Sequence, residues 1–377
     1  GSDPQELRSL PREGRLTGSH ARPAAGQLRR RPAPCSGIPT LPSIQSFPLG
    51  AFVVAATFLG DRPVFALGDG KVGIVDGAAA ETFGVHQGGL LAAARDEAGK
   101  RLVTSGDDGR VMAIDATGSL TALAERPKKW IDQLAVGPNG TIAFAGGREA
   151  VVLLEGGKER VLPHERTVAG LAFAPKGLRL AVARYNGVSL WWPGTDAKPT
   201  EFEWKGSHIG VTWSPDGRFV VTSMQENALH GWRTSDGGGH MRMSGYPGKV
   251  KTLSWSTRGR FLATSGAEMA VLWPFHFKEG PMGKQPLQLG VSAQSVVTQV
   301  ACHPSEEVVA IGYKDGSIIA ARFADGDEAR LRKVEGGPIS ALAWDTAGIR
   351  LAFGTEDGTA GIVDLAQIVD DRILEEM

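Results

Sequence analysis

Three segments decide the fold of this chain: VAGLAFAPKGLRLAVARYNGVSLWW (168–192), IGVTWSPDGRFVVTSMQENALHGW (209–232) and VKTLSWSTRGRFLATSGAEMAVLW (250–273). Each has the same order of parts: an apolar strand, a small turn, a second apolar strand, a tight polar turn and a third strand. Such copies of one short unit, side by side in the sequence, indicate a repeat architecture.

The same unit recurs on both sides of these three segments. Eight units are visible, at 52–76, 89–115, 131–154, 168–192, 209–232, 250–273, 297–322 and 339–364. A period near 40 residues with three strands leaves room for a fourth strand before the next unit, which is the plan of a propeller blade. We therefore predict an all-β propeller with eight blades, and seven blades as the alternative.

Turn-forming residues punctuate every unit. The chain holds 51 glycines and 22 prolines, and Pro215-Asp216-Gly217 has the order that a tight turn favours. Asp or Asn before Gly suits a hairpin turn in which both central residues have positive φ. We interpret five such residues as turn formers rather than catalytic groups: Asp69, Asp108, Asn186, Asp315 and Asp357.

The period and strings such as LAFAPKG (171–177), VTWSPDG (211–217) and LVTSGDDGRVMAID (102–115) resemble the WD40-repeat family over about 320 residues. The Trp-Asp ending of that family is split here. Some units keep the Asp without the Trp, and others the reverse. The family's buried His–Ser/Thr–Trp network is expected complete in no blade: His86 lacks the Trp, and His164 with Trp191 lacks the hydroxyl.

The ends of the chain suggest how the ring closes. Residues 365–377 look helical and make a poor fourth strand, whereas SIQSFPL (43–49) is an extended segment. We predict that this N-terminal strand is the outermost strand of the last blade, so that the two ends of the propeller join. Residues 43–377 then form a single β-propeller domain.

Residues 1–42 differ from the rest in composition. They hold seven arginines and seven prolines against three acids, and we expect a disordered basic tail. The whole chain has a formal net charge of +0, which makes nucleic acid an unlikely partner. No apolar run approaches the length of a membrane span. The two cysteines, Cys35 and Cys302, suit a reducing, cytoplasmic setting.

Catalytic motifs are missing from the sequence. There is no G-x-S-x-G, H-E-x-x-H or phosphate-binding glycine loop, and the eight histidines lack metal-ligand spacing. We therefore expect no catalytic residue, no metal and no cofactor, and hence not an enzyme. The alternative is a propeller enzyme, or a protein that binds a small ligand or metal in the central channel.

The WD40 resemblance implies a binding face at one mouth of the channel. The loops before the first strand and the turns between the second and third strands line that mouth in the family. Trp, Tyr and Arg are common anchors of protein interfaces. Carried over by position, the expected contact residues are Trp130, Lys128, Lys129, Arg148, Arg166, Arg184, Tyr185, Tyr246 and Lys249. We expect a monomeric scaffold or adaptor that binds another protein or peptide, of acidic character.

Overall fold

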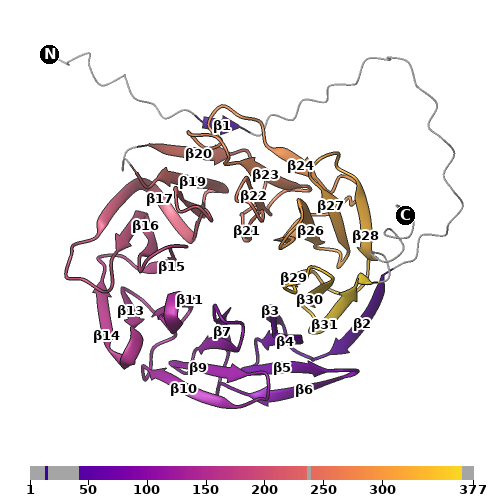
Figure 1. Cartoon of the computed structure of the whole chain (residues 1–377), viewed down its shortest axis with the longest axis horizontal. Coiled ribbons are helices and arrows are strands. Elements are labelled where there is room, and N and C mark those ends of the chain that lie inside the picture. Colours follow the sequence, from indigo (N-terminus) through magenta and orange to yellow (C-terminus); the bar gives the residue numbers. More distant parts are fainter. Residues whose placement is uncertain (1–12, 16–41, 236–238, 367–377) are drawn as a thin grey trace, which may run out of the picture.

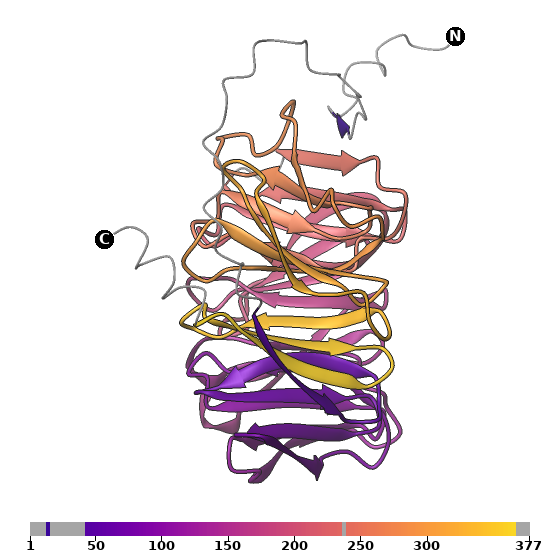
Figure 2. The ribbon, with the colours of Figure 1, turned by 90° about the vertical axis from the view of Figure 1, so that its right-hand side faces the viewer.

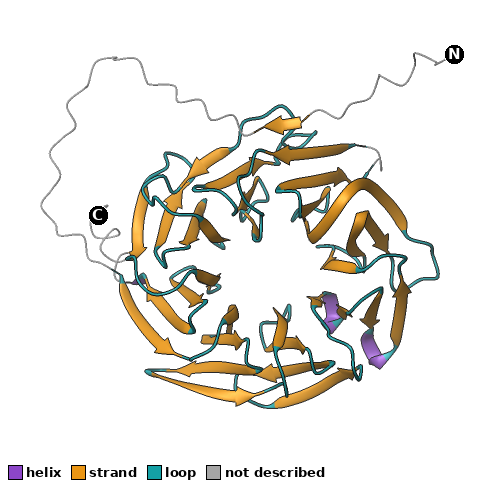
Figure 3. Ribbon diagram, turned by 180° about the vertical axis from the view of Figure 1, so that it is seen from behind, coloured by secondary structure: helices purple, strands orange, loops and turns teal. Residues whose placement is uncertain are grey.

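The computed structural model describes residues 13–15, 42–235 and 239–366, and these form a ring of β-sheets around one central axis (Figure 1). Seen from the side, the strands of each sheet run across the thickness of the ring (Figure 2). Strands dominate the chain, and the short helices η1 (Pro138–Gly140) and η2 (Glu155–Gly157) are 3-10 turns (Figure 3). The predicted all-β propeller is confirmed.

Six of the sheets have four strands each, with the first strand of the unit nearest the axis (Figure 1). Three of them come from the N-terminal part of the ring: β3 (Val53–Leu59), β4 (Arg62–Leu67), β5 (Lys71–Asp76) and β6 (Ala79–Gly84); β7 (Leu90–Arg95), β8 (Arg101–Gly106), β9 (Arg110–Asp115) and β10 (Leu120–Glu125); and β11 (Gln133–Val136), β12 (Ile142–Ala145), β13 (Glu149–Leu153) and β14 (Glu159–Pro163).

The other three four-stranded sheets follow later in the chain. They are β21 (Leu253–Trp255), β22 (Phe261–Thr264), β23 (Ala270–Pro274) and β24 (Leu287–Leu289); β25 (Val297–Cys302), β26 (Val308–Tyr313), β27 (Ile318–Arg322) and β28 (Glu328–Arg332); and β29 (Ile339–Trp344), β30 (Arg350–Thr355) and β31 (Thr359–Asp364) with β2 (Ser43–Pro48).

The seventh sheet has more strands than the others because it combines two repeat units, which is why the ring has seven sheets. It contains seven strands: β15 (Val168–Phe173), β16 (Leu180–Trp191), β17 (Thr200–Trp213), β18 (Phe219–Met224), β19 (Ala228–Arg233), β20 (His240–Ser244) and β1 (Glu13–Arg15).

One continuous strand joins two repeat units in this sheet. Residues 200–203 of β17 pair with β16, and residues 208–213 pair with β18. No proline interrupts β17, and Gly206 adopts the φ of 140° that lets the strand pass from one unit to the next. The eight repeat units therefore form seven hydrogen-bonded sheets. The prediction of eight separate blades is wrong, and the alternative of seven holds.

The predicted closing strand is confirmed. β2 pairs antiparallel with β31, with Ser43 opposite Asp364 and Pro48 opposite Thr359. Phe47 is buried in the apolar cluster between this sheet and β3–β6. A proline in β2 is tolerated because β2 is the edge strand of its sheet. The last sheet of the ring is thus completed by residues that come before the first sheet in the sequence.

The tail and the C-terminal end were predicted from composition alone. Residues 1–12, 16–41 and 367–377 lie outside the described residues, so the expected disorder and helix there stay predictions. Within the predicted tail, Glu13–Arg15 form β1, which pairs parallel with β20 from Glu13 opposite Arg242 to Arg15 opposite Ser244.

Candidate functional site

Two sets of loops form one face of the ring, which we call the loop face. The first set precedes the innermost strand of each unit, and the second joins its second and third strands. Backbone hydrogen bonds tie the sets together: Arg126 N–H donates to Gly109 O (2.7 Å), and Lys314 N–H donates to Val296 O (2.9 Å). Because each loop is held by a neighbouring turn, side chains on this face project from fixed backbone.

Exposed apolar side chains gather on the loop face. Of the eleven large hydrophobic residues exposed in the described part of the chain, six lie there: Phe52, Trp130, Tyr185, Val291, Val296 and Val334. Trp130 is 69% exposed, the highest value among them. Scattered exposed hydrophobics are ordinary, but a concentration on one face is typical of an interaction surface.

The Trp130 loop carries three of the predicted contact residues. Lys128, Lys129 and Trp130 are all exposed, and Lys128 has the positive φ of 64° that shapes the loop. The loop is anchored where Ile131 N–H donates to Gly106 O (3.1 Å). Lys129 pairs with Glu149 on the next turn at 3.2 Å. Such exposed ion pairs contribute little stability, so the lysine can change partner at small cost.

Three further predicted residues meet at a cavity of about 430 Å³, which we call the pocket. Its walls come from the segment after β14, from β16 and from the beginning of β17. The pocket brings Arg166, Arg184 and Tyr185 together with Pro163, His164, Glu165, Asn186, Ser189, Trp191, Pro199, Glu201 and Glu203. Arg148 does not line it, but its carbonyl accepts the His164 N–H (2.9 Å) at the edge.

The polar groups at the base of the pocket are bonded to one another. Arg184 donates to Glu201 (2.5 Å) and to Ser189 Oγ (3.0 Å), and Ser189 in turn donates to Glu201 (2.7 Å). His164 Nδ1 donates to Leu162 O (3.0 Å), while its Nε2 accepts the indole N–H of Trp191 (3.1 Å). The pocket is therefore preformed by hydrogen bonds within the chain.

The ionisation of His164 follows from this arrangement. Burial lowers the pKa of His164 below its usual value of 6.5, which keeps the imidazole neutral. The predicted pairing of His164 with Trp191 is present. No hydroxyl joins this pair, because the other ring nitrogen of His164 bonds to the carbonyl of Leu162.

The charge of the pocket differs from the basic face expected from the sequence. Three carboxylates, Glu165, Glu201 and Glu203, accompany the two guanidinium groups of Arg166 and Arg184. Glu201 neutralises Arg184 directly. The sequence did not reveal this balance, because Glu201 and Glu203 belong to a fourth strand whose pairing could not be assigned in advance.

Tyr246 is not available to a partner, which corrects its prediction as a contact residue. Its side chain is buried (6% exposed), and its hydroxyl lies 2.7 Å from Thr264 Oγ1 and accepts the indole N–H of Trp273 at 2.6 Å. Tyr246 thus replaces the histidine of the WD40-type network, which this unit completes. Lys249, three residues later, is exposed on the same loop.

A related network appears at His86. Its ring contacts Thr104 Oγ1 at 2.9 Å and Asp108 at 3.0 Å. Asp108 also accepts the Gln87 N–H (3.0 Å). Asp108 is therefore both a turn former and the partner that orients the histidine. Burial alone would raise the pKa of Asp108, but hydrogen bonds from the Gln87 backbone and from His86 bring this pKa below its usual value.

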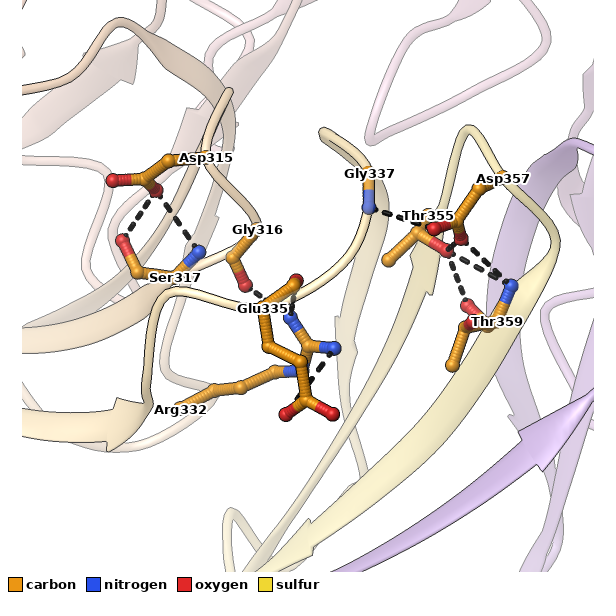
Figure 4. A network of polar contacts seen from close by, with 9 residues as sticks. All are labelled: Asp315, Gly316, Ser317, Arg332, Glu335, Gly337, Thr355, Asp357 and Thr359. Carbon is orange, nitrogen blue, oxygen red and sulfur yellow. Dashed lines mark hydrogen bonds and ion pairs between the residues drawn. The ribbon is translucent and has the colours of Figure 1, made fainter.

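The valines of the loop face are held by a different set of polar contacts. Glu328 accepts the Val291 N–H at 2.8 Å. Arg332 is buried, lies over the Phe353 ring (4.9 Å) and donates to the carbonyls of Gly316 and Glu335 (Figure 4). These bonds fix the loop on which Val334 is exposed. The exposed valines could not be recognised from the sequence, because nothing local distinguishes an exposed valine from a buried one.

The opposite end of that loop is fixed by Asp357. It accepts the Gly337 N–H (2.7 Å) and the Thr355 hydroxyl (2.5 Å), as Figure 4 shows. The hydrogen bond from Thr355 is the main reason that the pKa of Asp357 lies below its usual value. Asp357 was predicted to be a turn former, and it also joins its turn to the loop before β29.

The described residues hold neither a metal-binding cluster nor a membrane-spanning helix. Across residues 13–15, 42–235 and 239–366, no group of three or more His, Cys, Asp or Glu side chains is placed to hold a metal ion. Within the same described ranges, no helix has the length and apolar character needed to cross a membrane.

The geometry defines the class of this protein as a closed β-propeller, and comparison with solved structures agrees. The computationally designed Ika8 protein is similar to it with a TM-score of 0.66 and 18% identity, covering 84% of this chain and 96% of the designed one. At that identity the likeness concerns the fold alone. No protein-family model matches the chain.

Two curated proteins are similar in sequence over part of the chain. Telomerase protein component 1 of Rattus norvegicus is 25% identical over 202 residues, and that of Mus musculus is 24% identical over the same length. The match covers 52% of this chain but 7% of each relative. The chain thus spans a small fraction of the length of these relatives.

Proposed function

We propose that this protein is a non-catalytic, WD40-like scaffold or adaptor that binds another protein or peptide through the loop face. The observation that carries the proposal is the gathering of six exposed large hydrophobics on that face. When a partner covers apolar surface, the free energy of the system falls by roughly 25 cal/mol for each Å² buried. The remaining five exposed hydrophobics lie apart, on the strands and loops of the rim and opposite face.

The rigidity of the face supports this proposal. Binding is weakened when loops must be ordered, and here hydrogen bonds hold the loops before any partner arrives. Trp130, Tyr185 and Arg166 are of the residue types that most often anchor interfaces. The pocket adds a recess that a partner side chain can enter.

The partner, location and assembly state are part of the proposal. The curated relatives are named as a component of telomerase, and we infer that this chain also works within an assembly. Because the pocket holds three carboxylates and two guanidiniums, the partner need not be acidic. We propose that the chain is monomeric and lies in the cytoplasm, because its two cysteines are too few for a disulfide framework and suit a reducing compartment.

Affinity capture with matched variants tests the proposal. The loop-face variant is Trp130→Ala with Arg166→Ala, and the control is Val161→Ala with Lys158→Ala. Each variant removes one exposed apolar residue and one cation, but the control residues lie on or beside β14, away from the loop face. We expect the loop-face variant to capture at least tenfold less of each protein that the wild type and the control both capture. A tenfold loss of affinity corresponds to about 1.4 kcal/mol. Equal capture by all three would refute the proposal.

A further inference from the structure

Three histidines meet inside the seven-stranded sheet. His208 lies on β17, His230 on β19 and His240 on β20. The ring of His230 is 5.2 Å from that of His240 and 6.3 Å from that of His208, measured between centroids. Trp204 stacks on His230 at 4.3 Å, and Trp232 lies edge-on at 4.6 Å. We call these five residues the histidine cluster.

His230 is the most constrained member. Its side chain is fully buried, and neither ring nitrogen has a hydrogen-bond partner among the described residues. The buried Nδ1 of His240 also lacks one. A neutral imidazole offers one donor and one acceptor, so leaving both unmade in a dry site is unfavourable. A protonated imidazole would bury two donors and a charge, which costs far more.

The charges around the cluster make protonation harder. Burial, then the neighbouring His240, His208 and Arg242, lower the pKa of His230 to about 2. Strand β18 faces the cluster with Thr222, which is uncharged and bonds to His208 Nδ1 (2.7 Å).

One carboxylate, that of Glu226, acts on the histidine cluster, and it acts on His208 rather than on His230. Glu226 favours the charged form of His208, while Arg184 opposes it, and burial lowers the pKa of His208 overall. A proton that reached His230 would therefore find cationic neighbours and no counter-ion among the charges that act on it.

We propose that the histidine cluster is an acid-responsive switch, in which protonation opens strand β20 away from β19. β20 covers the cluster from the rim side of the sheet and pairs with β19 over four residue pairs, from Leu229–Met243 to Trp232–His240. Moving β20 admits water to the buried His230, while the strands nearer the axis keep their packing. β20 lies near the rim, but its Met241 and Met243 are buried against the next sheet, so its opening exposes those two side chains together with His230.

The switch lies next to the pocket. Ser207, which precedes His208 on β17, pairs with Tyr185, and the charge of Arg184 acts on both His164 and His208. Opening of the cluster is therefore expected to loosen one wall of the pocket and weaken partner binding in acid. This last consequence rests on the proposed function, whereas the switch itself does not.

Hydrogen exchange followed by mass spectrometry tests the switch without any partner. The samples are the wild type, His230→Leu and, as a surface control, His276→Leu, whose histidine is exposed. After correction for intrinsic exchange, we expect the opening constant of β19 and β20 in the wild type and control to rise up to about tenfold from pH 6.5 to pH 5.5. His230→Leu should remove most of that rise.

Two results would overturn the proposal. One is an opening constant for β19 and β20 that does not change with pH in the wild type. The other is an opening constant that is the same in β30 and β31 as in β19 and β20 at both pH values, which would mean that the ring opens only as a whole. If His230→Leu does not fold, His230→Gln provides a second non-titrating residue, and a pH response retained in it would refute the role of His230.

Discussion

Tyr246 shows how a single residue can preserve a network while changing its chemistry. Its hydroxyl connects Thr264 and Trp273 in the position that a histidine occupies in the WD40-type network. We expect Tyr246→Phe to lower the free energy of unfolding by about 1–3 kcal/mol, because the buried indole N–H of Trp273 loses its partner and Thr264 keeps only its bond to Val271 O. Urea denaturation measures this, with Tyr185→Phe as control, since Tyr185 is exposed. Equal midpoints for both variants would show that the network contributes nothing.

Arg332 is the second residue whose role is clear only in three dimensions. Its buried guanidinium joins the turn at Gly316 to the loop that exposes Val334. Arg332→Met should keep the apolar packing on Phe353 but leave two carbonyls unpaired. We expect faster hydrogen exchange in residues 333–338 and a loss of roughly 1–3 kcal/mol in stability. Unchanged exchange in that loop would show that other contacts hold it.

At the scale of elements, β2 is the strand that closes the ring. A truncation that begins at residue 40 retains β2 and loses only the three-residue β1 beside β20, so it should melt close to the full chain. A truncation that begins at residue 50 removes β2 and exposes the edge of β31 and the cluster around Phe47. We expect its melting temperature to fall by several degrees, as roughly 1 kcal/mol corresponds to a few degrees in a domain of this size. Identical melting curves would contradict closure by β2.

The elements also show what the sequence could predict. Strand order, turns and the closing strand follow from local patterns of apolar residues and glycine, so they were predicted. The union of two units through β17 was not, because residues 205–208 are compatible with either a loop or a continued strand. The pocket was half predicted: Arg184 and Tyr185 lie at a recognisable turn, but Glu201 enters through strand pairing that no local pattern specifies.

At the scale of the molecule, buried histidines make stability depend on pH. The pKa values of His164, His208 and His230 are all lowered by burial. Below pH 6.5 the unfolded chain binds protons that the folded chain does not, so stability is complete above that pH and falls as acid is added. For His230, whose pKa burial lowers to about 2, the loss approaches about 1.4 kcal/mol per pH unit, and His164 and His208 add to it. Urea denaturation at pH 7.5 and 5.5 should show this, and equal stabilities would contradict it.

The central claim is that the loop face binds a partner. The most direct measurement is hydroxyl-radical footprinting of the complex with a captured partner, read out residue by residue. We expect Trp130, Tyr185 and Val334 to lose reactivity on binding, while the exposed Leu120 and Val161 on the outer strands do not. Protection of Leu120 and Val161 with Trp130 unchanged would show that the partner binds elsewhere.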